Sequence, residues 1–224
     1  MKKMGSIDSI NFSNYAIESL FKNNNNYIIE DIKTIGVFKP KRWSETFGKA
    51  LTRNIIEAKI IHTSTGLTIP LKRYASAKHI QIIEFAGING YTEKSKLLKK
   101  ELENLLPLLQ DCMIKRIDIC FDFPKIPNSI IKNLCSNKRR PFKYINTVYY
   151  KTPKEKKTNN TLDIKSYNKQ KKDNLLIPME RLEFVFKGQY LKDISFKEID
   201  KSLLKIQRSI KKFSGINCKI FSIS

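Results

Sequence analysis

The chain has few of the residues that build zinc sites, and it has no long apolar run. Its 224 residues include two histidines and four cysteines, and no two cysteines have Cys-x-x-Cys spacing. No apolar run approaches the roughly 18 residues that a membrane-spanning helix needs, and residues 1–12 lack the apolar core of a secretion signal. We therefore predict a cytoplasmic protein with reduced cysteines, without a zinc site of the usual spacing and without a membrane partner.

Acidic residues are also scarce. The chain has 43 Lys and Arg against 21 Asp and Glu, which gives a formal net charge of +22 and a pI near 9.8. An A+T-rich genome inflates lysine content, but it does not explain why acids are so outnumbered. Such an excess of cations favours a polyanionic partner, because neutralised phosphates release their condensed counterions. We expect the partner to be a nucleic acid.

The apolar pattern predicts many short strands and few helices. Leucines at helical spacing predict a helix that begins after Thr92, and further helices are expected over 128–135 and 196–213. The expected strands cover 27–32, 35–38, 55–61, 78–86, 116–123, 143–151, 161–167 and 178–187. This pattern indicates an α+β fold with an antiparallel β-sheet and helices packed on one face. Residues 76–224 would form the main domain, and the basic, β-rich residues 1–75 are either a separate module or part of it.

Three of the predicted strands carry polar residues on one face. Side chains alternate between the two faces of a strand, so each segment can be sorted by parity. The polar positions are Arg116, Asp118, Cys120 and Asp122; Asp163, Lys165 and Tyr167; and Arg181, Glu183 and Lys187. If the apolar faces pack on one core, these polar faces meet and form a single site.

The residues of this site suit the attack of a tyrosine on a phosphodiester. A phenol with a pKa of about 10 is a poor nucleophile at neutral pH until its environment favours proton loss. Bound Mg²⁺ or Mn²⁺ would polarise the phosphate, and carboxylates such as Asp118 and Glu183 are suitable oxygen ligands. Lys165 and Lys169, on either side of Tyr167 in the sequence, could lower the pKa of the phenol or bind the phosphate.

The order of the motifs resembles that of the initiators of rolling-circle replication. The closest pattern is that of the filamentous-phage gene II type and the related plasmid Rep proteins, which are relatives of the HUH endonucleases. The matching motifs are Arg116-Ile117-Asp118, Tyr167-Asn168-Lys169 and Arg181-Leu182-Glu183, with Glu84-Phe85-Ala86-Gly87 upstream. The likeness spans about half of the chain, over residues 78–196. It implies an HUH-like Rep endonuclease fold and an enzyme that nicks one DNA strand at an origin through a 5′-phosphotyrosine intermediate, for replication of a phage or plasmid.

The resemblance also implies roles for single residues. Tyr167 would be the nucleophile, and Asp118 and Glu183 would hold Mg²⁺ or Mn²⁺, with Asp122 and Glu84 as further candidate ligands. The chain lacks the His-hydrophobe-His motif of the wider superfamily. In addition, Lys172 stands where the plasmid pattern has Glu, and the nearest acid is Asp173.

Basic residues with aromatic neighbours are candidates for DNA contact. Lysines that bind the backbone and aromatic rings that stack on splayed bases are how single strands are held. The candidates are Arg116, Lys138, Arg139, Arg140, Lys171, Lys172, Arg181, Lys41, Arg42 and Trp43, interleaved with Phe142, Tyr144, Tyr149 and Tyr150. The expected partner is single-stranded or hairpin origin DNA. Because the chain has no G-x-x-x-x-G-K-[ST] segment, unwinding would fall to a host helicase that works with a host polymerase.

Other interpretations stay open at this point. A non-catalytic DNA-binding regulator of replication or copy number would use the same scaffold, and an RNA-binding protein would use a similar basic sheet. Tyr167 could be a strand-end tyrosine with its hydroxyl in water, and Asp118 and Asp122 could face solvent. Pairing of Arg116 with Glu183, or of Arg181 with Asp118, would contribute under about 1 kcal/mol if exposed.

Overall fold

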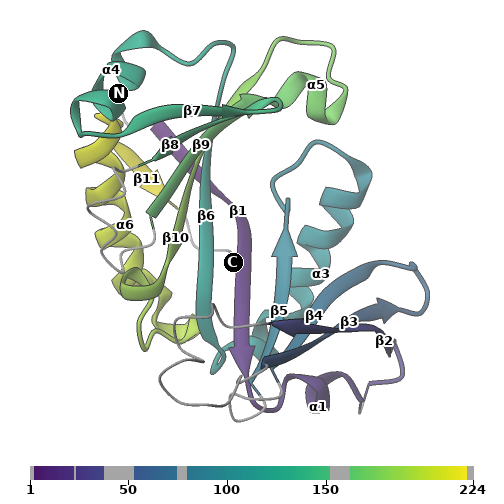
Figure 1. Ribbon diagram of the computed structural model, residues 1–224. Coiled ribbons are helices and arrows are strands. Elements are labelled where there is room, and N and C mark those ends of the chain that lie inside the picture. Colours follow the sequence, from purple (N-terminus) through teal and green to yellow (C-terminus); the bar gives the residue numbers. More distant parts are fainter. Residues whose placement is uncertain (1–2, 23, 38–52, 75–79, 152–161, 221–224) are drawn as a thin grey trace. The chain divides into compact units, whose positions relative to one another are not determined.

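A computed structural model describes residues 3–22, 24–37, 53–74, 80–151 and 162–220 (Figure 1). The helices are α1 (Ile17–Lys22), α3 (Glu93–Leu109), α4 (Asn128–Ser136), α5 (Lys169–Asp173) and α6 (Ile199–Ser214), with short 3-10 turns η3 (Gly188–Tyr190) and η4 (Phe196–Glu198). The strands are β1 (Lys3–Asn14), β2 (Tyr27–Val37), β3 (Arg53–His62), β4 (Thr68–Tyr74), β5 (Gln81–Ala86), β6 (Met113–Phe123), β7 (Arg140–Tyr144), β8 (Thr147–Lys151), β9 (Leu162–Asn168), β10 (Glu180–Lys187) and β11 (Cys218–Ile220). Among the residues described, no helix has both the length and the apolarity to cross a membrane.

The chain forms two compact units. The larger unit contains Met1–Ile10 and Ala86–Ser224, and the smaller unit contains Asn11–Phe85. A separate recognition role for residues 1–75 stays a prediction.

The larger unit is built on a sheet with the strand order β1-β6-β10-β9-β8-β7 (Figure 1). Pairing is antiparallel from β6 through β10, β9 and β8 to β7, while β11 pairs in parallel with β1. Helix α6 packs against α4 and β11. The prediction of an α+β fold with a large antiparallel sheet and helices is confirmed.

Apolar side chains on one face of this sheet form much of the core. Residues at alternate positions of the central strands are buried, namely Ile117, Ile119, Phe121 and Phe123 on β6 and Leu182, Phe184 and Phe186 on β10. The rings of Phe121 and Phe184 meet edge to face with centroids 6.0 Å apart. On β1, Gly5 lies where a Cβ atom would come within 3.0 Å of the Phe121 ring, so the absence of a side chain allows close packing. The parity predicted for these strands is confirmed.

The smaller unit is an antiparallel sheet of β2, β3, β4 and β5 with helix α1. Arg73 on β4 pairs with Glu18 on α1 and with Asp31 on β2. The pattern predicted two strands over 27–38, but β2 is one strand with an irregularity between Asp31 and Lys33. A β-bulge shifts the alternation by one residue, which explains why the apolar pattern looked like two segments.

Several other elements differ from the sequence prediction. Strands β1 and β4 were not predicted, and the strand expected over 143–151 is the hairpin of β7 and β8. Its turn contains Ile145 at φ 51°, a left-handed conformation that turns usually reserve for Gly or Asn. The helix after Thr92 is confirmed, with the Thr92 side chain accepting a hydrogen bond from the Ser95 N–H at 3.2 Å. Helices α4 and α6 also lie where the pattern predicted them.

Candidate functional site

The strand register brings the polar faces of β6, β10, β9 and β8 together. Residues directly opposite each other in an antiparallel pair project on the same side of the sheet. Two rows result, Asp122-Arg181-Tyr167-Thr147 and Cys120-Glu183-Lys165-Tyr149. The polar residues that were sorted by alternation therefore share one face of the larger unit.

Tyr167 and Lys165 both contact Glu183. The Tyr167 hydroxyl donates a hydrogen bond to Glu183 Oε1, and Lys165 Nζ lies 2.6 Å from Glu183 Oε2. Glu183 is 2% exposed, while Lys165 and Tyr167 are only partly buried. The tyrosine is thus not a strand-end residue with its hydroxyl only in water, because a buried carboxylate accepts its proton in a hydrogen bond.

Burial and neighbouring charges determine the protonation states of Tyr167 and Glu183. Burial and the neighbouring Glu183 charge raise the pKa of the Tyr167 phenol above its ordinary value. Burial alone would raise the pKa of Glu183, but the charge of Lys165 and the hydrogen bonds from Lys165 and Tyr167 hold it below its ordinary value. At neutral pH a neutral phenol therefore faces an ionised carboxylate.

A pocket of about 450 Å³ opens beside Tyr167. We call it the lysine pocket, because its lining includes the four lysines Lys143, Lys165, Lys171 and Lys172 together with Tyr149 and Tyr167. Lys172 Nζ lies 4.8 Å from the centroid of the Tyr167 ring. The Asn168 side chain caps α5 by accepting from the Lys171 N–H at 2.7 Å, which fixes the turn that carries Lys171 and Lys172.

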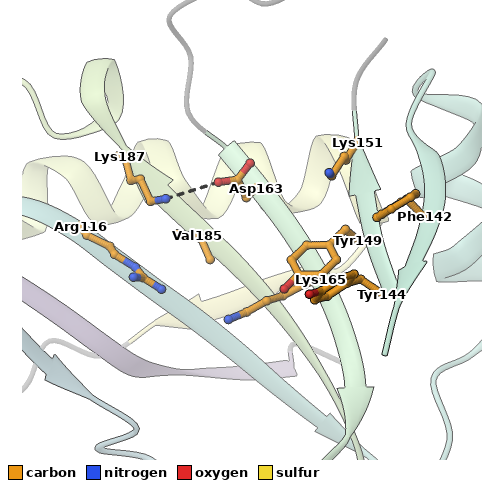
Figure 2. A pocket seen from close by; sticks show the side chains of 9 residues that line it. All are labelled: Arg116, Phe142, Tyr144, Tyr149, Lys151, Asp163, Lys165, Val185 and Lys187. Carbon is orange, nitrogen blue, oxygen red and sulfur yellow. Dashed lines mark hydrogen bonds and ion pairs between the residues drawn. The ribbon is translucent and has the colours of Figure 1, made fainter. Parts of the chain in front are cut away.

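A second pocket, of about 640 Å³, is lined by residues of β6, β7, β8, β9 and β10 (Figure 2). We call it the aromatic pocket after Phe142, Tyr144 and Tyr149. Tyr149 and Lys165 line both pockets, so the two adjoin on the sheet. Among the predicted DNA contacts, Arg116 belongs to this pocket.

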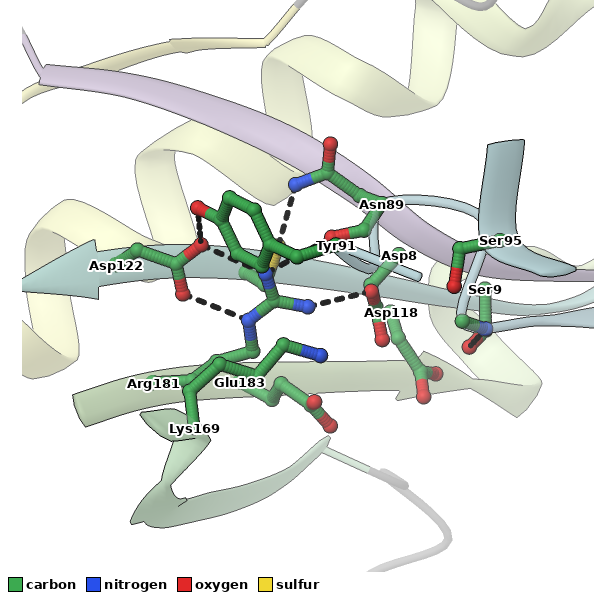
Figure 3. Close-up of polar contacts among 12 residues, drawn as sticks. Asp8, Ser9, Asn89, Tyr91, Ser95, Asp118, Asp122, Lys169, Arg181 and Glu183 are labelled. Carbon is green, nitrogen blue, oxygen red and sulfur yellow. Dashed lines mark hydrogen bonds and ion pairs between the residues drawn. The ribbon is translucent and has the colours of Figure 1, made fainter. Parts of the chain in front are cut away.

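Arg181 is the centre of a closed group of polar side chains (Figure 3). It is 0% exposed, and its guanidinium donates to Asp8 at 2.7 Å, to Asp122 at 2.6 and 2.7 Å and to the Asn89 carbonyl at 2.9 Å. The Tyr91 hydroxyl donates to Asp122 at 2.9 Å. We call Arg181, Asp8, Asp122, Asn89 and Tyr91 the arginine cluster. Because it is buried and fully engaged, Arg181 does not present a cation to DNA as the sequence predicted.

Burial disfavours the charged forms of the acids in this cluster. Burial raises the pKa of Asp8 although Arg181 is close, and burial together with the hydrogen bond to Asp122 raises the pKa of Tyr91 to about 12. Burial would also lower the pKa of Arg181, but hydrogen bonds and charge from the carboxylates outweigh it and raise that pKa. Arg181 therefore stays protonated and neutralises its acidic neighbours.

Lys169 does not reach the lysine pocket. It is 2% exposed, and its ammonium lies 2.8 Å from Asp173, whose carboxylate also accepts from the Tyr91 N–H at 3.1 Å. The catalytic role predicted for Lys169 from its position near Tyr167 in the sequence does not fit this placement, because its ammonium pairs within α5 with Asp173, which in turn links α5 to the loop before α3. Lys165 is the lysine that contacts the tyrosine's acceptor.

The predicted metal ligands are already paired with protein groups. Asp118 is 1% exposed rather than solvent-facing, and it accepts from Arg116 Nε at 2.7 Å and Nη2 at 2.6 Å. Asp122 is held by Arg181, Glu183 is held by Lys165 and Tyr167, and Glu84 lies on β5, which belongs to the smaller unit up to Phe85. In the part of the chain that the structure describes, no three His, Cys, Asp or Glu residues are placed to hold a metal ion. Mg²⁺ and Mn²⁺ need several free oxygen ligands, so this donor set does not fit them as arranged.

The remaining predicted DNA contacts divide by exposure. Arg139 is 5% exposed and donates to the Tyr150 and Leu162 carbonyls at 3.0 and 3.3 Å, so it links strands and does not face solvent. Lys138 and Arg140 are exposed, but neither lines the two pockets. Lys41, Arg42 and Trp43 lie outside the described residues.

Three members of the arginine cluster, Asp8, Asn89 and Tyr91, were not predicted from the sequence. Asp8 is the single acid of β1, on which Ile7, Ile10 and Phe12 are buried, and these neighbours would have indicated a buried acid if β1 had been predicted as a strand. Tyr91 lies in a loop, where no periodicity exists to indicate its direction. Its role depends on the fold of residues 87–92 over Arg181.

No family model, curated protein or solved structure matches the chain. The interpretation of the site consequently rests on its own geometry.

Proposed function

We propose that the protein is an initiator of rolling-circle replication with an HUH-like Rep endonuclease fold, and that it nicks one DNA strand by transesterification to Tyr167. The observation that carries the proposal is the Tyr167 hydroxyl bonded to the ionised Glu183 carboxylate at the edge of a pocket with four lysines. A nucleophile, a proton acceptor and a cationic phosphate site are the parts that such a reaction requires.

The proposed reaction exchanges one phosphodiester bond for another. Tyr167 Oη attacks the phosphorus while its proton passes to Glu183, and the bond between phosphorus and the 3′-oxygen breaks. The 3′-oxygen takes a proton from a lysine ammonium of the pocket. The 5′ end of the cut strand is then esterified to Tyr167, and a later attack by a 3′-hydroxyl reverses the steps and closes the strand.

The raised pKa of Tyr167 bears on the timing of proton transfer. A free phenolate is disfavoured beside Glu183, so the proton leaves as the new bond forms and not before. Lys165 keeps Glu183 ionised at neutral pH but also lowers its pKa, so transfer of the proton to this carboxylate depends on the bond that forms at phosphorus. Lys171 and Lys172, both exposed in the lysine pocket, offset the charge that develops on the phosphate oxygens.

No step is assigned to Mg²⁺ or Mn²⁺, because the carboxylates expected to bind them are paired with Arg116, Arg181 and Lys165. In this proposal the lysine ammonium groups provide the positive charge at the phosphate that the resemblance assigns to a divalent ion.

The test is a denaturing gel of the protein with circular single-stranded phage DNA, run with Mn²⁺ and separately with EDTA. We expect a protein band shifted by covalent DNA under both conditions, lost in Tyr167→Phe and kept in the matched control Tyr149→Phe. Tyr149 lines the same pocket, but its hydroxyl makes no hydrogen bond to the described residues, so loss of the adduct only in Tyr149→Phe would move the nucleophile to that residue. Cutting without any adduct would overturn transesterification. Cutting only with Mn²⁺ would show that the reaction needs a divalent metal ion.

A non-catalytic DNA-binding regulator is the second candidate. The closed pairing of Asp118 and Asp122 favours it, because these carboxylates are fully engaged within the protein. Binding without cutting, repeated on supercoiled DNA, would support this candidate. A preference for RNA over DNA of the same sequence would instead support an RNA-binding protein.

A further inference from the structure

The aromatic pocket contains one acid among its cations. Asp163 on β9 shares the lining with Arg116, Lys151, Lys165 and Lys187 (Figure 2). Its side chain is 64% exposed, and Lys187 Nζ lies 3.4 Å from its Oδ2. A carboxylate repels phosphate, so its presence in a pocket that otherwise attracts phosphate needs a different partner.

The aromatic residues of the pocket offer surfaces for a nucleobase. Phe142 and Tyr149 are opposite each other on β7 and β8, and Tyr144 lies two residues from Phe142 on the same strand. Phe142 and Tyr144 are 50% and 59% exposed. Lys151 Nζ lies 4.6 Å from the Phe142 ring centroid, which places a cation beside the rings for a neighbouring phosphate. Aromatic rings next to cations are the usual means of holding unpaired bases.

The pair of Asp163 and Lys187 defines which base edge fits. A carboxylate offers two acceptors, and the adjacent ammonium offers a donor. Guanine presents two neighbouring donors, N1–H and N2–H, followed by the acceptor O6. Adenine and cytosine each place a ring-nitrogen acceptor beside their amine, and thymine has a single donor between two acceptors. Guanine alone places two donors and an acceptor side by side, so it alone can fill both carboxylate oxygens and the ammonium at once, whereas each of the other bases offers Asp163 a single donor beside the acceptor for Lys187.

We propose that the aromatic pocket binds an unpaired guanine, which donates from N1 and N2 to Asp163 and accepts at O6 from Lys187 while its ring stacks on the aromatic side chains. The proposal rests on the proposed function, since this guanine belongs to the strand whose scissile phosphate lies in the lysine pocket. The shared residues Tyr149 and Lys165 make the two pockets adjoining parts of one path for that strand. Asp163 is then a specificity-determining residue, and the target strand must be unpaired where it crosses the sheet.

The test measures binding by fluorescence anisotropy with the full chain and short thymidine oligonucleotides that carry one dG, dA, dC or dT at a central position. We expect the dG strand to bind roughly 5- to 100-fold more tightly than the other three, which is the range of one good bidentate base contact. Asp163→Asn should reduce this preference to within about twofold, because one acceptor becomes a donor facing N1–H or N2–H. Asp163 is exposed, so this variant should fold.

The matched control is Asp111→Asn. Asp111 is also an exposed acid paired with a lysine, at 2.6 Å from Lys197, and it lies outside both pockets. This variant makes the same change in net charge and should keep the preference for dG. Equal loss in both variants would overturn the role of Asp163, as would equal affinity of the wild type for all four strands.

Competition with free dGMP distinguishes a binding site for a DNA strand from a binding site for a free nucleotide. We expect it to compete at least about 100-fold more weakly than the dG strand, because it lacks the neighbouring phosphates that the lysines would bind. Equal competition would overturn the assignment to DNA. A dG preference without a covalent adduct in the gel would support the guanine site and overturn the nicking reaction. An adduct without base preference would support the nicking reaction and overturn the guanine site.

Discussion

Arg181 and Glu183 lie two residues apart on β10 and on the same face of the sheet, but their surroundings differ. Both side chains are buried. Arg181 is held by Asp8, Asp122 and the Asn89 carbonyl, all of them protein groups inside the arginine cluster. Glu183 is held by Lys165 and Tyr167, which also line a pocket. Two buried charges on one strand therefore differ in whether their partners line a pocket: those of Arg181 line neither of the two pockets, and those of Glu183 line the lysine pocket.

The geometry of the guanidinium explains why the arginine cluster is closed. Arg181 uses Nε, Nη1 and Nη2 as donors to groups from β1, from β6 and from the loop before α3. A planar fork of donors fits such a fixed set of acceptors better than a single ammonium does. The cluster thus joins three parts of the larger unit, and it is expected to hold β10 in position.

The greatest change in stability is expected for Arg181→Ala. Removing this side chain leaves Asp8 and Asp122 without their cation in a buried site, which should lower the free energy of unfolding by about 3–5 kcal/mol. Urea denaturation of the folded protein measures it, with Arg208→Ala on the exposed side of α6 as the matched control, expected within about 0.5 kcal/mol of wild type. If the Arg181 variant does not fold, Asp122→Asn gives a milder test. A loss in the free energy of unfolding smaller than that of Arg208→Ala would contradict a structural role for the cluster.

A more modest and pH-dependent change is expected for Glu183→Gln. The folded-state pKa of Glu183 lies below its ordinary value of 4.5, so its ion pair adds stability above that value and loses it as pH falls through the folded pKa. The wild type should be more stable than the variant by about 1.5–3 kcal/mol at pH 7, and the difference should shrink below pH 4.5.

Chemical denaturation at several pH values measures this difference. Asp8 and Asp118 have pKa values raised mainly by burial and also by the charge of Glu183, so they act in the opposite sense, and more strongly in the wild type than in the variant. Glu93→Gln, at an exposed acid on α3, controls for the loss of one charge. A difference that grows towards low pH would contradict the pairing of Glu183 with Lys165.

Stability should change least in the double variant Lys171→Ala and Lys172→Ala. Both side chains are exposed, so the free energy of unfolding should stay within about 0.5 kcal/mol of wild type. Binding of single-stranded DNA should nevertheless become less salt-dependent. The slope of log K against log salt should fall by about 0.7 for each phosphate that the protein no longer neutralises.

The adjacent, exposed lysines of α6 provide the control for this variant. Lys211→Ala with Lys212→Ala removes the same charge away from both pockets and should leave the slope unchanged. Equal slopes for the two double variants would show that the lysine pocket is not a phosphate site.

The parts of the site that were predicted from the sequence depend on local patterns. Alternation along β6, β9 and β10 placed Asp118, Tyr167 and Glu183 on one face, and the structure brings these strands together in that sense. The hairpin of β7 and β8 was missed because its turn has Ile145 where a Gly or Asn would have been a signal. Lys169 was misjudged because closeness to Tyr167 in the sequence does not fix the direction of a side chain, and α5 directs it to Asp173, four residues later on the same helix.

Composition and side-chain alternation were enough to establish the basic character of the chain, the strands β6, β9 and β10 and the residues of their polar face, because these are local properties. Which acid pairs with which cation depended on the packing of distant segments. Asp8 and Arg181 are 173 residues apart in the chain, and their contact depends on the position of β1 beside β6. The same long-range packing closes the arginine cluster and leaves Tyr167 at a pocket, since the energy of a buried charge depends on the neighbours that the fold supplies and not on its place in the sequence.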